Sequence, residues 1–178
     1  MSTERLRLFV ALELPERARQ ALVRWRAPVA GDLRPVSPDA LHLTLCFLGW
    51  QDSGAVKAIA AACDAVASMP SAELTVGEGI WLPSRRPRVL AVELSGSIAG
   101  VQSALSDALA AGGFYVAEKR PFLAHVTVAR VPRHARVARS ELPPTPPLRF
   151  NGSDIVLFRS HLSPAGARYE PLHMVRLS

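Results

Sequence analysis

Two short segments of the chain carry the same pair of polar residues at the same spacing. His42 and Thr44 are separated by one leucine, and His125 and Thr127 by one valine. Both segments resemble β-strands, in which successive side chains point to opposite faces, so each histidine shares a face with its threonine. The two histidines lie nearly half of the 178-residue chain apart. If the fold brings the two strands together, four side chains become available for one reaction.

Two imidazoles in one site suit a reaction that needs an acid and a base at the same pH. Histidine has an ordinary pKa of about 6.5, so one ring can be neutral while the other is protonated. Each well-placed proton transfer contributes about 10²–10⁴ in rate, and a threonine hydroxyl can donate to an anionic oxygen. A phosphoryl group fits such a site. One His-x-Thr alone is more often structural, and the second copy is what favours chemistry.

Other kinds of site have less support in the sequence. Two histidines make an incomplete zinc shell, and no Cys, Asp or Glu stands at ligand spacing around either strand, so we expect no metal or other cofactor. A serine elbow, a P-loop and a dinucleotide-binding glycine pattern are absent from the sequence. Strict alternation places Cys46 on the face of His42, but no cysteine-enzyme motif surrounds it. His134, His161 and His173 are interpreted as surface or structural residues.

Hydrophobic periodicity and turn residues predict an alternation of strands and helices. A helix is expected to open at Pro15-Glu16, because proline is tolerated in the first turn and glutamate favours the positive end of a helix. The segment 131–148 is too rich in proline for a helix or a central strand. The predicted strands are 6–14, 41–48, 72–82, 88–94, 122–131, 149–159 and 169–177, and the predicted helices are 15–29, 54–68 and 97–111.

The second half of the chain repeats the order of the first. LFVALEL at 8–14 resembles VLAVELS at 89–95, and each is followed by a helix and then by a His-x-Thr strand. We therefore predict an α+β fold of two similar lobes from an internal duplication. Mainly antiparallel sheets with helices outside would enclose a central cleft on a pseudo-twofold axis. The whole chain, 1–178, is expected to form one bilobal domain, with repeats at roughly 5–82 and 87–160 and a last strand to 178.

Composition sets limits on the class of protein. Hydrophobic residues make up 49% of the chain, which supports a sizeable core. The net charge of +6 comes almost entirely from arginine, which favours partners such as RNA but is also consistent with a solubility feature or with coding bias. The sequence contains no apolar run of membrane-spanning length, and two cysteines are too few for a disulfide framework. We therefore expect a cytoplasmic protein that is not bound to a membrane. We also expect a monomer, although the sequence does not identify the oligomeric state.

At these motifs the chain resembles the 2H phosphoesterases, and among them the RNA 2′,3′-cyclic phosphodiesterases, also called 2′-5′ RNA ligases. The two HxTx motifs of that family match HLTL at 42–45 and HVTV at 125–128. In two places the chain departs from the family: Ala124 stands where proline is frequent, and Cys46 where lysine is common. The resemblance spans nearly the whole chain and includes HLTLCFLG at 42–49, PRVLAVEL at 87–94, RPFLAHVTVAR at 120–130 and LFRSHLSPAGARYEPL at 157–172.

This resemblance implies the 2H phosphoesterase fold and a metal-independent hydrolase. The enzyme would open an RNA or nucleoside 2′,3′-cyclic phosphate to a 2′-phosphomonoester. By similarity, His42 would be the proton donor to the departing 3′ oxygen, and His125 the proton acceptor that activates water. Thr44 and Thr127 would bind the phosphate. The sequence alone does not distinguish acid from base, because the two motifs are nearly equivalent.

Three further residues are candidates for substrate binding. Arg130 belongs to the second motif region, but strict alternation places it on the face opposite His125, so a role in the site requires a β-bulge or a strand end. Phe47 and Phe122 can stack a base, although core packing is the more common role for such residues. The arginine-rich loops at 84–88 and 130–139 can guide RNA phosphates or form an ordinary solvated surface.

Alternative functions stay open at the level of sequence. The partner is expected to be an RNA with a 2′,3′-cyclic phosphate end or a cyclic nucleotide. A module that binds RNA ends or nucleotides without turnover would use the same residues, although the intact set of two histidines and two threonines speaks against lost catalysis. Within the enzyme class, another cyclic phosphate or 2′-5′ RNA ligation is the competing reaction.

Overall fold

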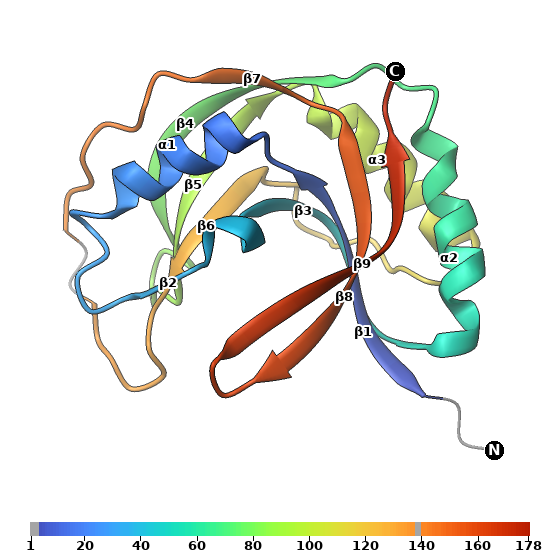
Figure 1. The fold of residues 1–178 in the computed structure, drawn as a ribbon, viewed down its shortest axis with the longest axis horizontal. Helices are drawn as coiled ribbons and strands as arrows, with labels where there is room; N and C mark the ends of the chain where they lie inside the picture. Colours follow the sequence, from blue (N-terminus) through green and yellow to red (C-terminus); the bar gives the residue numbers. More distant parts are fainter. Residues whose placement is uncertain (1–3, 138–139) are drawn as a thin grey trace.

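A computed structural model describes residues 4–137 and 140–178 of the chain. The described part is a strongly curled β-sheet with three α-helices (Figure 1), which confirms the predicted α+β class. Short 3₁₀ turns span Pro38–Ala40, Ser53–Ala55 and Asp64–Val66. The elements are β1 (Arg5–Glu13), α1 (Glu16–Arg26), β2 (Arg34–Pro35), β3 (His42–Asp52), α2 (Val56–Cys63), β4 (Ala72–Leu82), β5 (Val89–Gly96), α3 (Ile98–Ala111), β6 (His125–Arg130), β7 (Arg149–Gly152), β8 (Asp154–Ser163) and β9 (Gly166–Arg176).

Corresponding strands of the two halves occupy corresponding positions when the sheet is followed from its two ends. The order is β7-β4-β5-β6-β3-β1-β8-β9, with β2 paired to β6, so the two His-x-Thr strands are central neighbours. The strand that closes the first half, β4, pairs with β5 of the second half, and β8 of the second half pairs with β1 of the first. Each half therefore completes the sheet of the other. The exact repeat boundaries at 5–82 and 87–160 stay a prediction.

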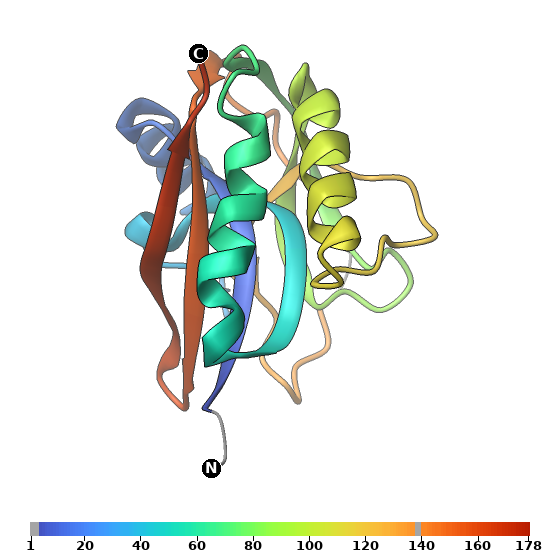
Figure 2. The ribbon, with the colours of Figure 1, turned by 90° about the vertical axis from the view of Figure 1, so that its right-hand side faces the viewer.

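The main hydrophobic core lies on the helix side of the sheet. Leu8, Val10 and Leu12 of β1 are fully buried there and belong to one cluster with the apolar faces of all three helices. Figure 2 shows α2 and α3 side by side along this face of the molecule. Burying a leucine contributes roughly 1.5–3 kcal/mol. The alternate residues of β1, Phe9 and Ala11, point to the opposite face, where they form a small second cluster.

Helix α1 is held against the sheet by a close backbone approach. Its N-terminal residue Glu16 follows Pro15, as predicted, and Leu22 and Trp25 lie on its buried face. A Cβ at Gly79 would come within 2.7 Å of the Trp25 ring, so only glycine permits this packing. The Trp25 indole also donates to the Pro143 carbonyl at 3.2 Å. Pro143 of the proline-rich segment thus lies against α1, and the described residues of 131–148 form no helix or strand.

Several predicted boundaries differ from the observed ones. The predicted strand 149–159 is two strands, because β7 pairs with β4 while β8 pairs with β1, and the chain changes partner at Ser153. The predicted helix 54–68 is α-helical only over Val56–Cys63, with a 3₁₀ turn on each side. The short strand β2 lies between the predicted helix 15–29 and the predicted strand 41–48, where the sequence analysis predicted no strand. No helix in the described ranges is long and apolar enough to cross a membrane.

Candidate active site

The pairing of β3 with β6 brings the two motifs together. Leu43 lies opposite Val126, and both are fully buried in the core. In this antiparallel register the flanking residues point to the other face, with His42 across from Thr127 and Thr44 across from His125. These four side chains line one small cavity of about 60 Å³, together with Val36, Ala40, Arg130 and Tyr169.

The two histidine rings are oriented in the same way. His42 Nδ1 lies 2.7 Å from the carbonyl oxygen of Ala40, and His125 Nδ1 lies 2.8 Å from that of Leu123. A carbonyl oxygen only accepts hydrogen bonds, so each Nδ1 carries a proton and donates it. In the neutral state each Nε2 therefore has a free lone pair. Each carbonyl belongs to the residue two positions before its histidine. The two motifs therefore share the same histidine tautomer as well as the same residue pattern.

The surroundings of His42 keep its ring neutral. Its Nε2 lies 3.0 Å from Thr44 Oγ1, and the rings of Phe9 and Tyr169 lie 5.0 and 5.2 Å from its centroid. Burial lowers the pKa of His42 from 6.5 to about 4, and the nearby charge of Arg130 adds to this, although the hydrogen bond to Ala40 opposes it. At neutral pH the unprotonated Nε2 therefore accepts a hydrogen bond from the Thr44 hydroxyl.

Both motif strands contain a β-bulge three residues after the histidine. In β6 the register passes from Thr127 to Ala129, which leaves Val128 as the extra residue, and in β3 it passes from Thr44 to Cys46 and skips Leu45. A bulge reverses the alternation of side chains. The side chain two residues beyond each bulge therefore returns to the face that carries the histidines.

Arg130 reaches the cavity through the bulge at Val128. It lines the small cavity with His42 and His125, although strict alternation would have placed it on the other face. The equivalent residue after the first bulge is Phe47, which is 46% exposed. The structure thus contains the bulge that a role for Arg130 requires.

A buried cation supports the bulge in β6. Arg26 of α1 is only 7% exposed and donates from its guanidinium to the carbonyl of Val128 at 2.8 Å and to that of Val36. Burial lowers the pKa of Arg26. The sequence analysis did not identify Arg26, because an arginine on the apolar side of a helix gives no sequence signal that it supports a bulge in a neighbouring strand.

The expected position of Cys46 was wrong. Because the bulge at Leu45 reverses the alternation, Cys46 points into the main core, away from His42. It is 1% exposed, and burial raises the pKa of its thiol to about 12. The thiol therefore does not act as a nucleophile. Within residues 4–137 and 140–178, no group of three or more His, Cys, Asp or Glu side chains is arranged to hold a metal.

A larger pocket of about 910 Å³ adjoins the small cavity and shares Thr44, His125 and Thr127 with it. Phe47 lines this pocket, so the expectation of core packing was wrong for that residue. Phe122 both lines the pocket and packs against the core. Further lining residues include Arg88, Gln102, Tyr115, Glu118 and Arg120.

The predicted arginine-rich loops reach the site only in part. Arg88 of the first loop lines the large pocket, and Arg130 of the second lines the small cavity. Arg133 and Arg136 are exposed. Positions 138 and 139 of the second loop lie outside the described residues.

Tyr169 is a lining residue for which the sequence predicted no role. It comes from β9, and its ring meets that of His42 edge-on. The other histidines lie elsewhere: His161 contacts Glu170 at 2.6 Å, and His173 contacts Asp64 at 2.7 Å. Pairing of β9 with β8 sets the position of Tyr169, and no local spacing in the sequence encodes that placement.

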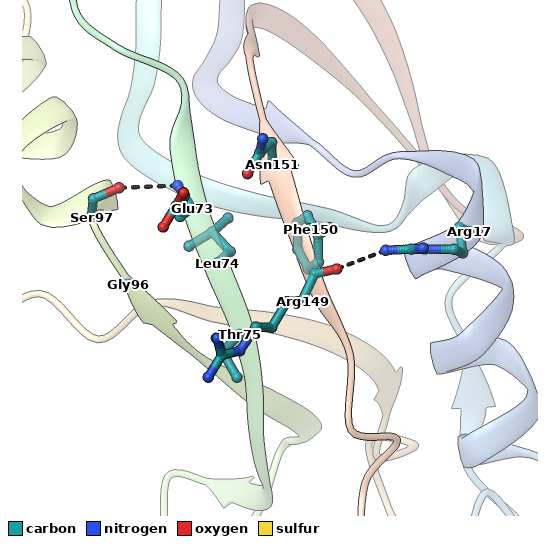
Figure 3. Close-up of a pocket in the computed structure, with 9 residues that line it drawn as sticks. All are labelled: Arg17, Glu73, Leu74, Thr75, Gly96, Ser97, Arg149, Phe150 and Asn151. Atoms are coloured by element: carbon teal, nitrogen blue, oxygen red, sulfur yellow. Dashed lines mark hydrogen bonds between the residues drawn. The ribbon is translucent and has the colours of Figure 1, made fainter.

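A separate pocket of about 500 Å³ lies along β4 and β7 (Figure 3). Arg17 donates to the Arg149 carbonyl at 2.7 Å, and Ser97 Oγ accepts from the Glu73 amide at 3.0 Å. Its lining contains none of the motif residues. It is therefore distinct from the candidate site.

Comparisons with known proteins identify similar chains over nearly the full length. Residues 12–91 match the model of the LigT like Phosphoesterase family. The RNA 2′,3′-cyclic phosphodiesterase of Escherichia coli (strain K12) is 32% identical, covering 96% of both chains. That of Thermus thermophilus is 30% identical, covering 97% of this chain and 90% of the relative. The crystal structure of E. coli LigT with 3′-AMP superposes with a TM-score of 0.82 at 27% identity, covering 98% and 99% of the two chains.

Proposed function

The chain belongs to the LigT-like phosphoesterase family, and we propose that it hydrolyses RNA or nucleoside 2′,3′-cyclic phosphates to 2′-phosphomonoesters. One observation supports this most directly: two His-x-Thr pairs, whose histidine rings contact equivalent backbone carbonyls, line a single cavity of about 60 Å³. A water molecule occupies about 30 Å³ in the liquid, so the cavity has room for about two waters. This is the size of a small group such as a phosphoryl group. The relatives at about 30% identity carry the name of the same activity.

The proposed reaction uses one histidine on each side of the phosphorus. His125 Nε2 accepts a proton from water, and the water oxygen attacks the phosphorus. The bond from phosphorus to the 3′ oxygen breaks, and His42 Nε2 delivers a proton to that oxygen. The phosphate then remains on the 2′ oxygen. Thr44, Thr127 and Arg130 line the cavity as donors to the non-bridging oxygens, where negative charge grows.

His42 acquires its proton together with the substrate. In the free protein its pKa is about 4, and the Thr44 hydroxyl donates to its Nε2. A phosphate anion in the cavity favours the protonated ring, because it supplies the opposite charge beside Arg130 and His125. Thr44 has only one hydroxyl proton, so it turns from the ring to a phosphate oxygen when Nε2 becomes a donor. Substrate binding thus gives His42 the proton with which it can act as the acid.

The large pocket is the place for the nucleoside. Its 910 Å³ exceeds the needs of a phosphate, and it opens directly onto Thr44 and His125. Phe47 offers an exposed ring for base stacking, and Phe122 lines the same pocket. Two buried cysteines without a disulfide fit a cytoplasmic enzyme, and we expect it to act as a monomer.

The test is product analysis with a panel of 2′,3′-cyclic nucleotides, followed by phosphorus NMR. The expected product is the 2′-monophosphate, formed equally with and without EDTA. His42→Ala and His125→Ala should each lower kcat by at least about 10², the lower range for one proton transfer. A 3′-monophosphate product, or activity abolished by EDTA and restored by zinc, would contradict the proposal. Circular dichroism of both variants checks that the fold is retained.

A further inference from the structure

Trp50 is an exposed aromatic residue near the end of β3 that the proposed reaction does not use. Its exposed fraction is 56%, although a large aromatic side chain gains most from burial. None of the described residues accepts a hydrogen bond from its indole nitrogen. Tryptophan in this state is enriched where a protein meets a partner.

Trp50 lies on the same face of the sheet as the active site. It stands directly opposite Arg7 in the antiparallel pairing of β1 with β3, and directly opposed residues share a face. The Arg7 guanidinium lies 4.6 Å from the centroid of the Phe47 ring and donates to Ser160 Oγ at 3.2 Å. Trp50, Arg7 and Phe47 therefore form one surface, which we call the Trp50 platform.

The Trp50 platform continues directly from the nucleoside pocket. Phe47 belongs to both, because it lines the large pocket together with Thr44 and His125. Phe47 lies three positions after Thr44 along the strand, and Trp50 lies three positions after Phe47. Each step is at most about 10 Å at the usual rise of a strand. The distances suit two successive nucleotides of an extended RNA strand.

The charge of the platform fits a phosphodiester. The carboxylates at this end of the sheet already have partners: Glu4 contacts Arg159 at 2.6 Å, Asp52 contacts Arg5 at 3.5 Å, and Glu170 contacts His161 at 2.6 Å. Within the described part of the chain, no carboxylate lies within ion-pair distance of Arg7. Its guanidinium is thus available for a phosphate between two nucleotides.

We propose that the Trp50 platform is a second nucleotide subsite, which binds the residue preceding the cyclic-phosphate end of an RNA strand. The terminal base stacks on Phe47, the linking phosphodiester contacts Arg7, and the preceding base stacks on Trp50. Aromatic platforms with interspersed arginine are the usual means of binding single-stranded nucleic acid. The proposal rests on the proposed function and narrows its substrate class to RNA ends rather than mononucleotides.

A protein partner fits this surface less well. Stable protein interfaces bury about 800 Å² per partner around an apolar centre. Around Trp50 the exposed neighbours on β1 and β3 are the charged residues Arg5 and Asp52. One aromatic ring beside arginines matches a base and a phosphate better than it matches an apolar interface.

The first test compares two substrates that differ by one nucleotide. A 2′,3′-cyclic mononucleotide and a dinucleotide with the same cyclic end are hydrolysed by the wild type and by Trp50 variants. The ratio of kcat/KM for the dinucleotide over the mononucleotide should fall at least about fivefold in Trp50→Ala, the effect of losing one stacked base. Trp50→Phe should restore most of the ratio, whereas Trp50→Leu, which keeps apolar area but no ring, should not.

The second test measures binding directly. A dinucleotide that ends in a 2′-phosphate, the reaction product, should quench the tryptophan fluorescence of the wild type and quench Trp50→Phe much less. Arg7→Ala should reduce the slope of log affinity against log salt by about 0.7, the value for one phosphate contact on a single strand. Arg24→Ala, the same charge change on exposed α1, should leave the slope unchanged.

The possible outcomes separate a failure of the proposed function from a failure of the second nucleotide subsite. If the wild type opens neither cyclic substrate, the proposed function fails. If it opens both and the ratio is the same in Trp50→Ala, the second subsite is refuted while the function stands. If light scattering shows concentration-dependent self-association that Trp50→Ala abolishes, the surface contacts a second copy and the RNA subsite is overturned.

Discussion

The two motif histidines differ in their surroundings although the two motifs share one pattern. His42 is enclosed by Phe9 and Tyr169, and it does not line the large pocket. His125 lines both cavities. The histidine that faces the large pocket is therefore placed to meet water. The enclosed one is neutral in the free protein, because burial disfavours its protonated form, so a role as proton donor requires that it gain its proton with the substrate.

Burial of His42 gives a testable dependence of stability on pH. Its pKa in the folded protein is about 4, against an ordinary 6.5, so between these values the unfolded chain binds more protons than the folded one. Stability from this residue is complete above pH 6.5 and is lost as the pH falls toward 4. The difference in unfolding free energy between wild type and His42→Asn should shrink by about 3 kcal/mol from pH 7 to pH 4, from 1.36 kcal/mol per pH unit.

Urea unfolding at a series of pH values measures this difference. His173→Asn is a matched control, because His173 lies at the surface beside Asp64 and outside the aromatic cluster. A constant difference between wild type and His42→Asn across pH 4–7 would show that the ring is not kept neutral by the fold.

At the scale of elements, the two bulges decide which residues enter the site. Alternation predicted the shared face of each His and Thr correctly, because these lie before the bulge. It misplaced Cys46 and left Arg130 unresolved, because a bulge belongs to the pairing of two strands and not to the sequence of one. The break between β7 and β8 had a local signal, since Asn151-Gly152-Ser153 is a turn-forming run. Tyr169 had none.

The bulge in β6 should depend on Arg26. Arg26→Met keeps much of the side-chain volume but removes the guanidinium donor from both carbonyls. The Val128 carbonyl still accepts from the Val36 amide at 3.0 Å, whereas the Val36 carbonyl loses its side-chain donor, at about 1–3 kcal/mol for an unsatisfied buried group. We expect lower stability and, because the bulge directs Arg130 into the cavity, a loss of kcat/KM approaching that of Arg130→Ala. Denaturant unfolding and steady-state kinetics measure the two effects.

The same helix provides the control for this prediction. Arg24→Met changes an exposed arginine of α1 and should be neutral in both measurements. If Arg26→Met is as stable and as active as Arg24→Met, the buried guanidinium does not support the bulge. If Arg26→Met is less stable but fully active, the Arg26 guanidinium supports the fold without positioning Arg130.

At the scale of the molecule, the halves are interleaved. β4 pairs with β5, β8 pairs with β1, α1 packs against β6, and α3 packs against β3. The duplication predicted two similar lobes, but an internal repeat does not show which half supplies each pairing partner. The exchange places both histidines on adjacent central strands. A site built at this junction exists only when both halves are folded.

The interleaving predicts that the chain unfolds in one step. Neither half has a complete sheet without strands from the other, so loss of one removes pairing partners from the second. Unfolding in urea, followed by tryptophan fluorescence and by far-UV circular dichroism, should give coincident transitions with one midpoint. Calorimetry should give equal calorimetric and van't Hoff enthalpies. Two separated transitions would show that the lobes are independent domains, and the shared site would then have to assemble after each lobe had folded.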